Sequence, residues 1–134
     1  MRIEELSIDD WVQARKLEWD YYNLYITPPM RVVQIGYSEV KLELNGIEHY
    51  AFIEDIQPIP LTPEILKKNG LCVVEEDADF SEYELFSSEN FSIFHVKGTL
   101  RYRLETPQAS VVCWFVHQLQ HALRLAEVEK EIEI

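Results

Sequence analysis

Two histidines four residues apart, His117 and His121, are the residues whose spacing first suggests chemistry. Histidines at positions i and i+4 lie on one face of a helix, which is the ligand spacing of zinc proteases. The glutamate that activates the metal-bound water in that motif is replaced here by Gln118, and an amide cannot act as the base. The sequence therefore argues against a metalloprotease and leaves a metal site without that chemistry open.

A thiol extends this pattern, because Cys113, His117 and His121 follow one another at four-residue steps. In a continuous helix all three lie along one side, and His95 or His49 would have to supply a further ligand. The competing interpretation is the polar face of an amphipathic helix, which we favour because such histidine pairs also arise by chance. We likewise expect Cys113 to be an unreactive thiol rather than a nucleophile.

Other motifs of enzyme chemistry are missing from the sequence. It contains no glycine-rich phosphate loop, no dinucleotide-binding fingerprint and no nucleophile elbow. An acidic stretch lacks the spacing and the glycine of an EF-hand, so a solvated loop is the better interpretation. Its residues are Glu75, Glu76, Asp77, Asp79, Glu82, Glu84 and Glu89. We therefore expect no catalytic residues and no cofactor.

Aromatic side chains are the other resource for recognition. Several crowd the N-terminal segment, and two large apolar residues fall outside the main apolar stripe of the last predicted helix. Core packing is the alternative for any single one of them, since large apolar side chains are mostly buried. The predicted partner-binding residues are Trp11, Trp19, Tyr22, Trp114 and Leu125.

The charge balance restricts the class of partner. Among 134 residues, 12 are Lys or Arg and 24 are Asp or Glu, which gives a net charge of −12. A field of this sign repels phosphate backbones and anionic lipid, so we expect no direct binding of nucleic acid or membranes. It also raises an alternative function, an acidic mimic of nucleic acid that blocks a DNA-binding protein.

Features that are missing from the sequence indicate the compartment in which the protein is located. The chain shows no basic, apolar leader after Met1 and no apolar run long enough to span a bilayer. Its two cysteines, Cys72 and Cys113, stand in unlike contexts, which is typical of reduced thiols. We expect a cytoplasmic protein.

The first set of elements is expected before a group of prolines at positions 58 to 63. The segment from Ser7 to Tyr25 fits either a helix or two strands, 11–14 and 21–26. We favour strands, because the hairpins that follow need a partner to cover their apolar face. Residues 1–60 are thus predicted to form a small antiparallel barrel of the Src-homology type. Its other strands are 30–35, 39–44 and 47–53, with Asn45-Gly46 as a hairpin turn.

The second set, residues 61–134, is predicted to begin with a short helix over 63–69, capped by Thr62 and opened by Pro63. A β-meander and a long final helix from 110 or 111 to 126 follow, and the tail alternates acidic and aliphatic residues as an edge strand does. The meander strands are 71–74, 83–86, 91–96 and 99–104. Together the two sets predict an α+β protein, with the meander packed on the final helix.

Three segments resemble a family of small uncharacterised proteins of Bacteroides-type bacteria, often encoded near phage-like or mobile genes. The segments are Leu6 to Val12, Pro58 to Gly70 (PIPLTPEILKKNG) and Val116 to Leu123 (VHQLQHAL). The resemblance implies no established activity. It also implies an asparagine at the position of His121 in similar sequences, and hence an incidental histidine pair.

The residues taken together favour a non-enzymatic protein-binding or accessory protein, associated with phage or mobile elements. Its partner is expected to be another protein. The acidic nucleic-acid mimic and a metal-binding protein using the final-helix histidines are the alternatives.

Overall fold

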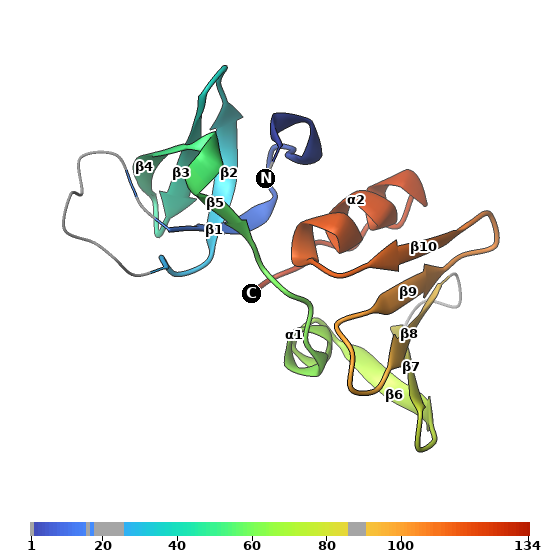
Figure 1. Ribbon diagram of the computed structural model, residues 1–134. Coiled ribbons are helices and arrows are strands. Elements are labelled where there is room, and N and C mark those ends of the chain that lie inside the picture. Colours follow the sequence, from blue (N-terminus) through green and yellow to red (C-terminus); the bar gives the residue numbers. More distant parts are fainter. Residues whose placement is uncertain (1, 16, 18–25, 86–90) are drawn as a thin grey trace. The chain divides into compact units, whose positions relative to one another are not determined.

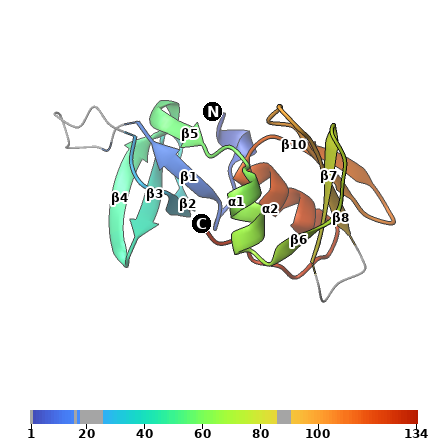
Figure 2. The ribbon, with the colours of Figure 1, turned by 90° about the horizontal axis from the view of Figure 1, so that it is seen from below.

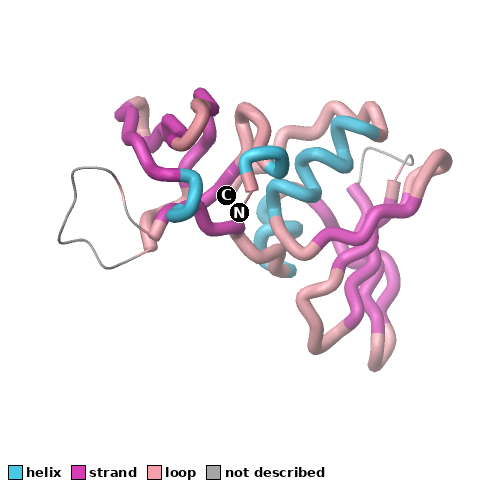
Figure 3. Tube along the Cα trace, turned by 45° about the horizontal axis from the view of Figure 1, so that its top comes forward, coloured by secondary structure: helices cyan, strands magenta, loops and turns pink. Residues whose placement is uncertain are grey.

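A computed structural model describes residues 2–15, 17, 26–85 and 91–134 (Figure 1). The chain divides into two compact units, Met1–Ile59 and Pro60–Ile134. Each unit contains one five-stranded antiparallel sheet with short helical segments beside it (Figure 3). The predicted α+β class is confirmed.

The first unit is a sheet in the order β4-β3-β2-β1-β5. A 3₁₀ turn, η1 (Ile3–Glu5), precedes the sheet, and a second one, η2 (Ile53–Asp55), connects β4 to β5. The strands are β1 (Trp11–Ala14), β2 (Met30–Ile35), β3 (Glu39–Leu44), β4 (Ile47–Phe52) and β5 (Ile56–Pro58).

Alternation of side chains explains this sheet. In β3, Val40 and Leu42 are fully buried, whereas Lys41 and Glu43 face the other side. Asn45 and Gly46 both adopt a left-handed conformation, with φ of 53° and 80°, and this turn joins β3 to β4 as predicted.

The two strands predicted before residue 27 have different outcomes. The strand expected over 11–14 is present as β1, which pairs with β2 and β5. Of the strand expected over 21–26, residues 21–25 lie outside the described residues, and Ile26 is not in a strand. The next residue, Thr27, is bonded to the end of β1, because its Oγ1 accepts the Ala14 N–H at 2.9 Å.

The second unit is a meander in the order β10-β9-β8-β7-β6, in which every strand pairs with its sequence neighbour. Figures 1 and 2 show helix α2 on one side of this sheet. The elements are α1 (Pro63–Lys68), β6 (Leu71–Glu76), β7 (Phe80–Leu85), β8 (Ser92–Val96), β9 (Tyr102–Glu105), β10 (Ser110–Cys113) and α2 (Val116–Leu125).

The final helix begins later than predicted. Ser110–Cys113, expected to be its first turn, forms β10 and pairs residue by residue with β9. The β-branched Val111 and Val112 suit a strand, and the unpaired edge of β9 provides the partner that a sequence pattern cannot reveal. The prediction of a helix from 110 was therefore wrong over its first six residues, 110 to 115.

The C-terminal tail is not the edge strand that its alternation suggested, since residues 127–134 form no strand. Asn69, the C-cap of α1, holds it instead. Its side-chain amide donates to the Glu133 carbonyl at 2.8 Å and its Oδ1 accepts the Glu133 N–H at 2.7 Å. Ile132 beside this clasp is only 3% exposed.

Candidate functional site

The predicted histidine pair lies on α2, but not on a solvated face. His117 is 3% exposed and His121 is half-buried, with their ring centroids 5.7 Å apart in an edge-to-face arrangement. The ring of His117 also stacks on Phe115 at 6.0 Å. The polar-face interpretation was therefore wrong for His117, whose surroundings are those of a packed side chain.

Cys113 does not extend the histidine pair into a helical series, because it belongs to β10 rather than to α2. Its thiol is buried, and burial raises its pKa to about 11, so it stays protonated at neutral pH. Within the described ranges no three His, Cys, Asp or Glu side chains are grouped closely enough to hold a metal ion. His95, considered as a further ligand, stacks on Tyr102 at 4.2 Å, with its Nε2 2.9 Å from the Thr99 carbonyl oxygen.

Gln118, where the protease motif has its glutamate, has a structural role. Its Oε1 accepts the N–H groups of Trp114 at 2.8 Å and Phe115 at 3.2 Å. These donors precede the first turn of α2 and have no carbonyl within the helix to bond. The amide therefore fixes where the helix begins.

The predicted partner-binding residues do not all belong to one unit. Trp11 on β1 is half-buried beneath Arg31, whose guanidinium carbon is 5.4 Å from the ring centroid. Trp19 and Tyr22 lie outside the described residues. Trp114 is 44% exposed between β10 and α2, and Leu125 is 86% exposed at the end of α2. Trp11 thus belongs to the first unit, and Trp114 and Leu125 belong to the second.

A more continuous surface lies on the second sheet, on the face that we name the outer face. Alternate residues of its central strands are buried on the opposite, inner face, including Tyr83, Ile93 and Tyr102. The side chains between them point outward. The outer face is formed by Phe80, Glu82, Glu84, Ser92, Phe94, Val96, Arg101, Arg103 and Glu105.

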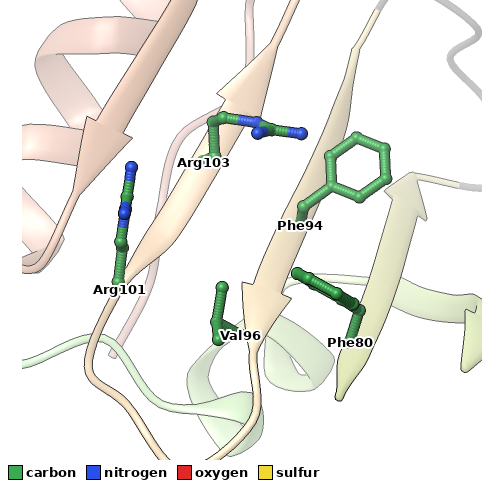
Figure 4. A pocket seen from close by; sticks show the side chains of 5 residues that line it. All are labelled: Phe80, Phe94, Val96, Arg101 and Arg103. Carbon is green, nitrogen blue, oxygen red and sulfur yellow. The ribbon is translucent and has the colours of Figure 1, made fainter. Parts of the chain in front are cut away.

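A hollow of about 250 Å³ opens on this face, lined by Phe80, Phe94, Val96, Arg101 and Arg103 (Figure 4). The guanidinium of Arg103 extends over the ring of Phe94, with its carbon 5.2 Å from the centroid, and also pairs with Glu105. Phe80 is 48% exposed, which is high for a phenylalanine. The hollow thus combines apolar rings with an oriented cation.

Arg101 is the cation without an internal partner. Its side chain is exposed, and within 2–15, 17, 26–85 and 91–134 its guanidinium makes neither an ion pair nor a hydrogen bond. Its backbone is held by the preceding turn, where Thr99 Oγ1 accepts the Arg101 N–H at 3.1 Å. An anchored backbone with an unengaged guanidinium is suited to bind a carboxylate.

Phe80 is positioned by the turn before β7. Asp77 Oδ1 accepts the N–H groups of Asp79 and Phe80, each at 2.8 Å, and these two bonds hold the pKa of Asp77 below its ordinary value of 3.8. Lys97 fastens the same turn from the β8–β9 side, with its Nζ 2.7 Å from Glu76 and 2.6 Å from the Asp77 carbonyl. Phe80 therefore begins β7 at a fixed position.

The β7 side of the outer face carries a glutamate, Glu82, that lies close to other carboxylates. Burial raises the pKa of Glu82, and repulsion from Glu84 and Glu75 raises it further. No ion pair to Glu82 is present among the side chains that the structure describes. The outer face thus carries a cation without an ion pair to described residues, Arg101, just before β9 and an uncompensated anion, Glu82, on β7.

Sequence reasoning missed this surface. A signal exists in Phe94-x-Val96 and Arg101-x-Arg103, because residues two apart in a strand share a face. Only the register of β8 against β9, which no local pattern specifies, brings the two pairs together.

Comparison with known proteins adds no relative, because no family model, curated protein or solved structure matches the chain. In the described part of the chain no helix combines the length and apolar character required for a membrane span.

Proposed function

We propose that the chain is a non-enzymatic protein-binding protein whose docking surface is the outer face of the second sheet. The partner that fits is a protein segment presenting carboxylates beside apolar side chains. The observation that carries this proposal is the unengaged Arg101 across the hollow from the half-exposed Phe80, with Val96 between them (Figure 4).

The chemistry of the hollow favours this class of ligand. A guanidinium binds carboxylates through two parallel N–H groups, and aromatic side chains with arginine are the commonest energetic anchors of protein interfaces. Arg103 is already oriented by Phe94 and Glu105, so little conformational entropy is lost when a ligand carboxylate reaches it.

The first unit is proposed to be a barrel of the Src-homology type. Support comes from the strand order, in which β1 lies between β2 and β5, and from the 3₁₀ turn η2 before the last strand. Trp11 on this unit and Trp114 and Leu125 on the second are proposed as secondary contacts. The proposed place of action is the cytoplasm, and an association with phage or mobile elements remains a prediction of the family resemblance.

A peptide titration monitored by NMR tests the docking surface. Isotope-labelled protein is titrated with a short peptide alternating glutamate and leucine, and with a matched peptide alternating lysine and leucine. We expect the acidic peptide to shift the backbone amide signals of Phe80, Phe94, Val96, Arg101 and Arg103, and the basic peptide to leave them in place.

Two results would overturn the proposal. One is equal shifts with both peptides, which would mean that the arginines do not select the ligand. The other is an absence of shifts on the outer face at peptide concentrations in the millimolar range, where even weak docking is detected.

A further inference from the structure

Resting on the proposed function, we infer that the protein segment bound by the outer face is the same face of a second copy of this chain. The two copies pair face to face about a twofold axis that runs along β8. The basic strand of one copy then lies over the acidic strand of the other.

The register of three strands defines a central row across the outer face. Phe94 on β8 pairs with Arg103 on β9 and with Glu82 on β7. Directly opposed residues in an antiparallel sheet point to the same face. The row therefore runs from a cation through a ring to an anion.

A second row lies beside the first. Phe80 on β7 pairs with Val96, and the Val96 N–H donates to the Arg101 carbonyl oxygen at 3.4 Å. This row runs from a cation through an apolar side chain to a ring. In both rows the cation is on the β9 side, Arg103 within β9 and Arg101 just before it, and β8 contributes only apolar groups.

A twofold axis along β8 exchanges the β9 and β7 sides of the face. The rings of Phe94 from the two copies meet on the axis, and Arg103 of each copy faces Glu82 of the other. In the second row, Arg101 faces the ring of Phe80 of the other copy, which is a cation–π arrangement. Every charged group of these two rows gains an attractive partner.

The alternative twofold axis, perpendicular to the strands, is disfavoured by the same register. It would leave each strand over its own counterpart, and when it passes through the row of Phe94, Arg103 faces Arg103 and Glu82 faces Glu82. Like charges in contact across an interface are costly, which selects the axis along β8.

The electrostatics of the single copy support this pairing. Burial, and then repulsion from Glu84 and Glu75, raises the pKa of Glu82, and no cation among the described residues offsets this. Arg103 from a second copy would supply the missing positive charge, and Glu82 would supply a second carboxylate to an arginine already held over Phe94.

The interface also has a cost, which limits its strength. In the row through Ser92, Glu84 and Glu105 occupy the β7 and β9 positions, so they face each other across the axis as like charges. Five strands about 4.8 Å apart span roughly 19 Å, a small contact area. We therefore expect a concentration-dependent dimer of micromolar affinity.

A charge-swap experiment tests the pairing. Sedimentation velocity of the full chain at physiological salt is expected to show monomer converting to dimer as concentration rises. Arg103→Glu and Glu82→Arg each place like charges opposite one another, and each should raise the dimer Kd by at least about tenfold. In an equimolar mixture of the two variants both contacts are again of opposite charge, so a mixed dimer should form.

Matched controls carry the same charge changes away from the face. Lys68→Glu, at the exposed end of α1, and Glu129→Arg, in the exposed tail, should dimerise as the wild type does. Thermal unfolding checks that each variant is folded. Should a charge reversal not fold, Arg103→Gln and Glu82→Gln replace it, and each should still weaken the dimer.

Three results would overturn the inference. They are a wild-type protein that stays monomeric up to high concentration, single variants that dimerise as the wild type does, and a mixture that does not recover the dimer. A monomer that still shows peptide shifts on the outer face would overturn self-pairing alone. A monomer without such shifts would overturn the docking surface as well.

Discussion

The two sheets of this protein each place a cation beside an aromatic ring over a shallow hollow and pair that cation with a glutamate of the same sheet, but the second hollow has a further cation, Arg101, in its lining. In the first unit the hollow of about 240 Å³ is lined by Gln34, Gly36, Glu39, Lys41 and Tyr50. There Lys41 Nζ is 3.3 Å from Glu48 and 5.5 Å from the centroid of the Tyr50 ring, and both neighbours raise the Lys41 pKa. The cation is satisfied within its own sheet.

In the second unit the hollow of about 250 Å³ is lined by three apolar side chains and two arginines, of which Arg101 has no ion pair with described residues. We therefore do not expect a cation near a ring to define a binding surface by itself. We expect a binding surface where an uncompensated cation lies in the same hollow as exposed apolar area, because a ligand then gains both contacts without breaking an existing one.

Phe94→Asp is expected to weaken binding at the second hollow more than any other single substitution discussed below. It removes the central ring of the outer face and puts a carboxylate where two copies meet, so both peptide binding and dimerisation should fall more than about tenfold. Isothermal titration with the glutamate–leucine peptide and sedimentation measure the two effects. Tyr50→Asp is the matched change in the first hollow, and an equal loss there would contradict the distinction between the sheets.

Asp77→Ala is expected to have a smaller effect, through the position of Phe80. The pKa of Asp77 is lowered in the folded state, so its stabilisation is present above its ordinary value of 3.8 and is lost as pH falls through the lowered value. The variant should unfold at a lower temperature than wild type at pH 7 and at the same temperature in strong acid. Peptide affinity should fall about two- to fivefold. A stability difference that persists unchanged in acid would contradict this role.

Glu84→Gln should strengthen the inferred pairing rather than weaken it. It removes the like-charge contact with Glu105 of the second copy and one source of repulsion on Glu82. The dimer should become about two- to threefold tighter, as measured by sedimentation across a concentration series. Glu82→Gln at the neighbouring position should weaken it, and the same sign for both variants would argue against the proposed register.

Lys41→Gln should have the smallest effect on binding. Its raised pKa gives stability that is fully present below the ordinary value of 10.5 and is lost as pH rises through the raised value. The variant should therefore be slightly less stable at neutral pH, with peptide affinity unchanged. A loss of affinity would mean that the first hollow also takes part in docking.

Local chemistry was enough to predict several elements from the sequence. Thr62 caps α1 through its Oγ1, which accepts the Ile65 N–H at 3.2 Å, and Pro63 opens the helix as expected. Asn45 and Gly46 form the predicted hairpin turn. In each case the signal lies within a few residues.

The remainder could not be predicted because it depends on pairing between distant segments. Val112 and Val116 fit the apolar stripe of one helix. Val112 nevertheless pairs with the edge of β9 in a strand, and the hydrogen bond from the Phe115 N–H to Gln118 makes the helix begin only after that strand. The outer face likewise exists only through the register that brings Phe94 beside Arg103. The residues were visible in the sequence, and their common face was not.

The most direct test of the account is a dilution series of the isotope-labelled wild-type protein followed by backbone amide NMR signals. Pairing through the outer face predicts concentration-dependent shifts at Phe80, Phe94, Val96, Arg101 and Arg103, with the signals of Gln34, Lys41 and Tyr50 in the first hollow unchanged. Shifts confined to the first hollow, or none on the outer face over the whole series, would contradict it.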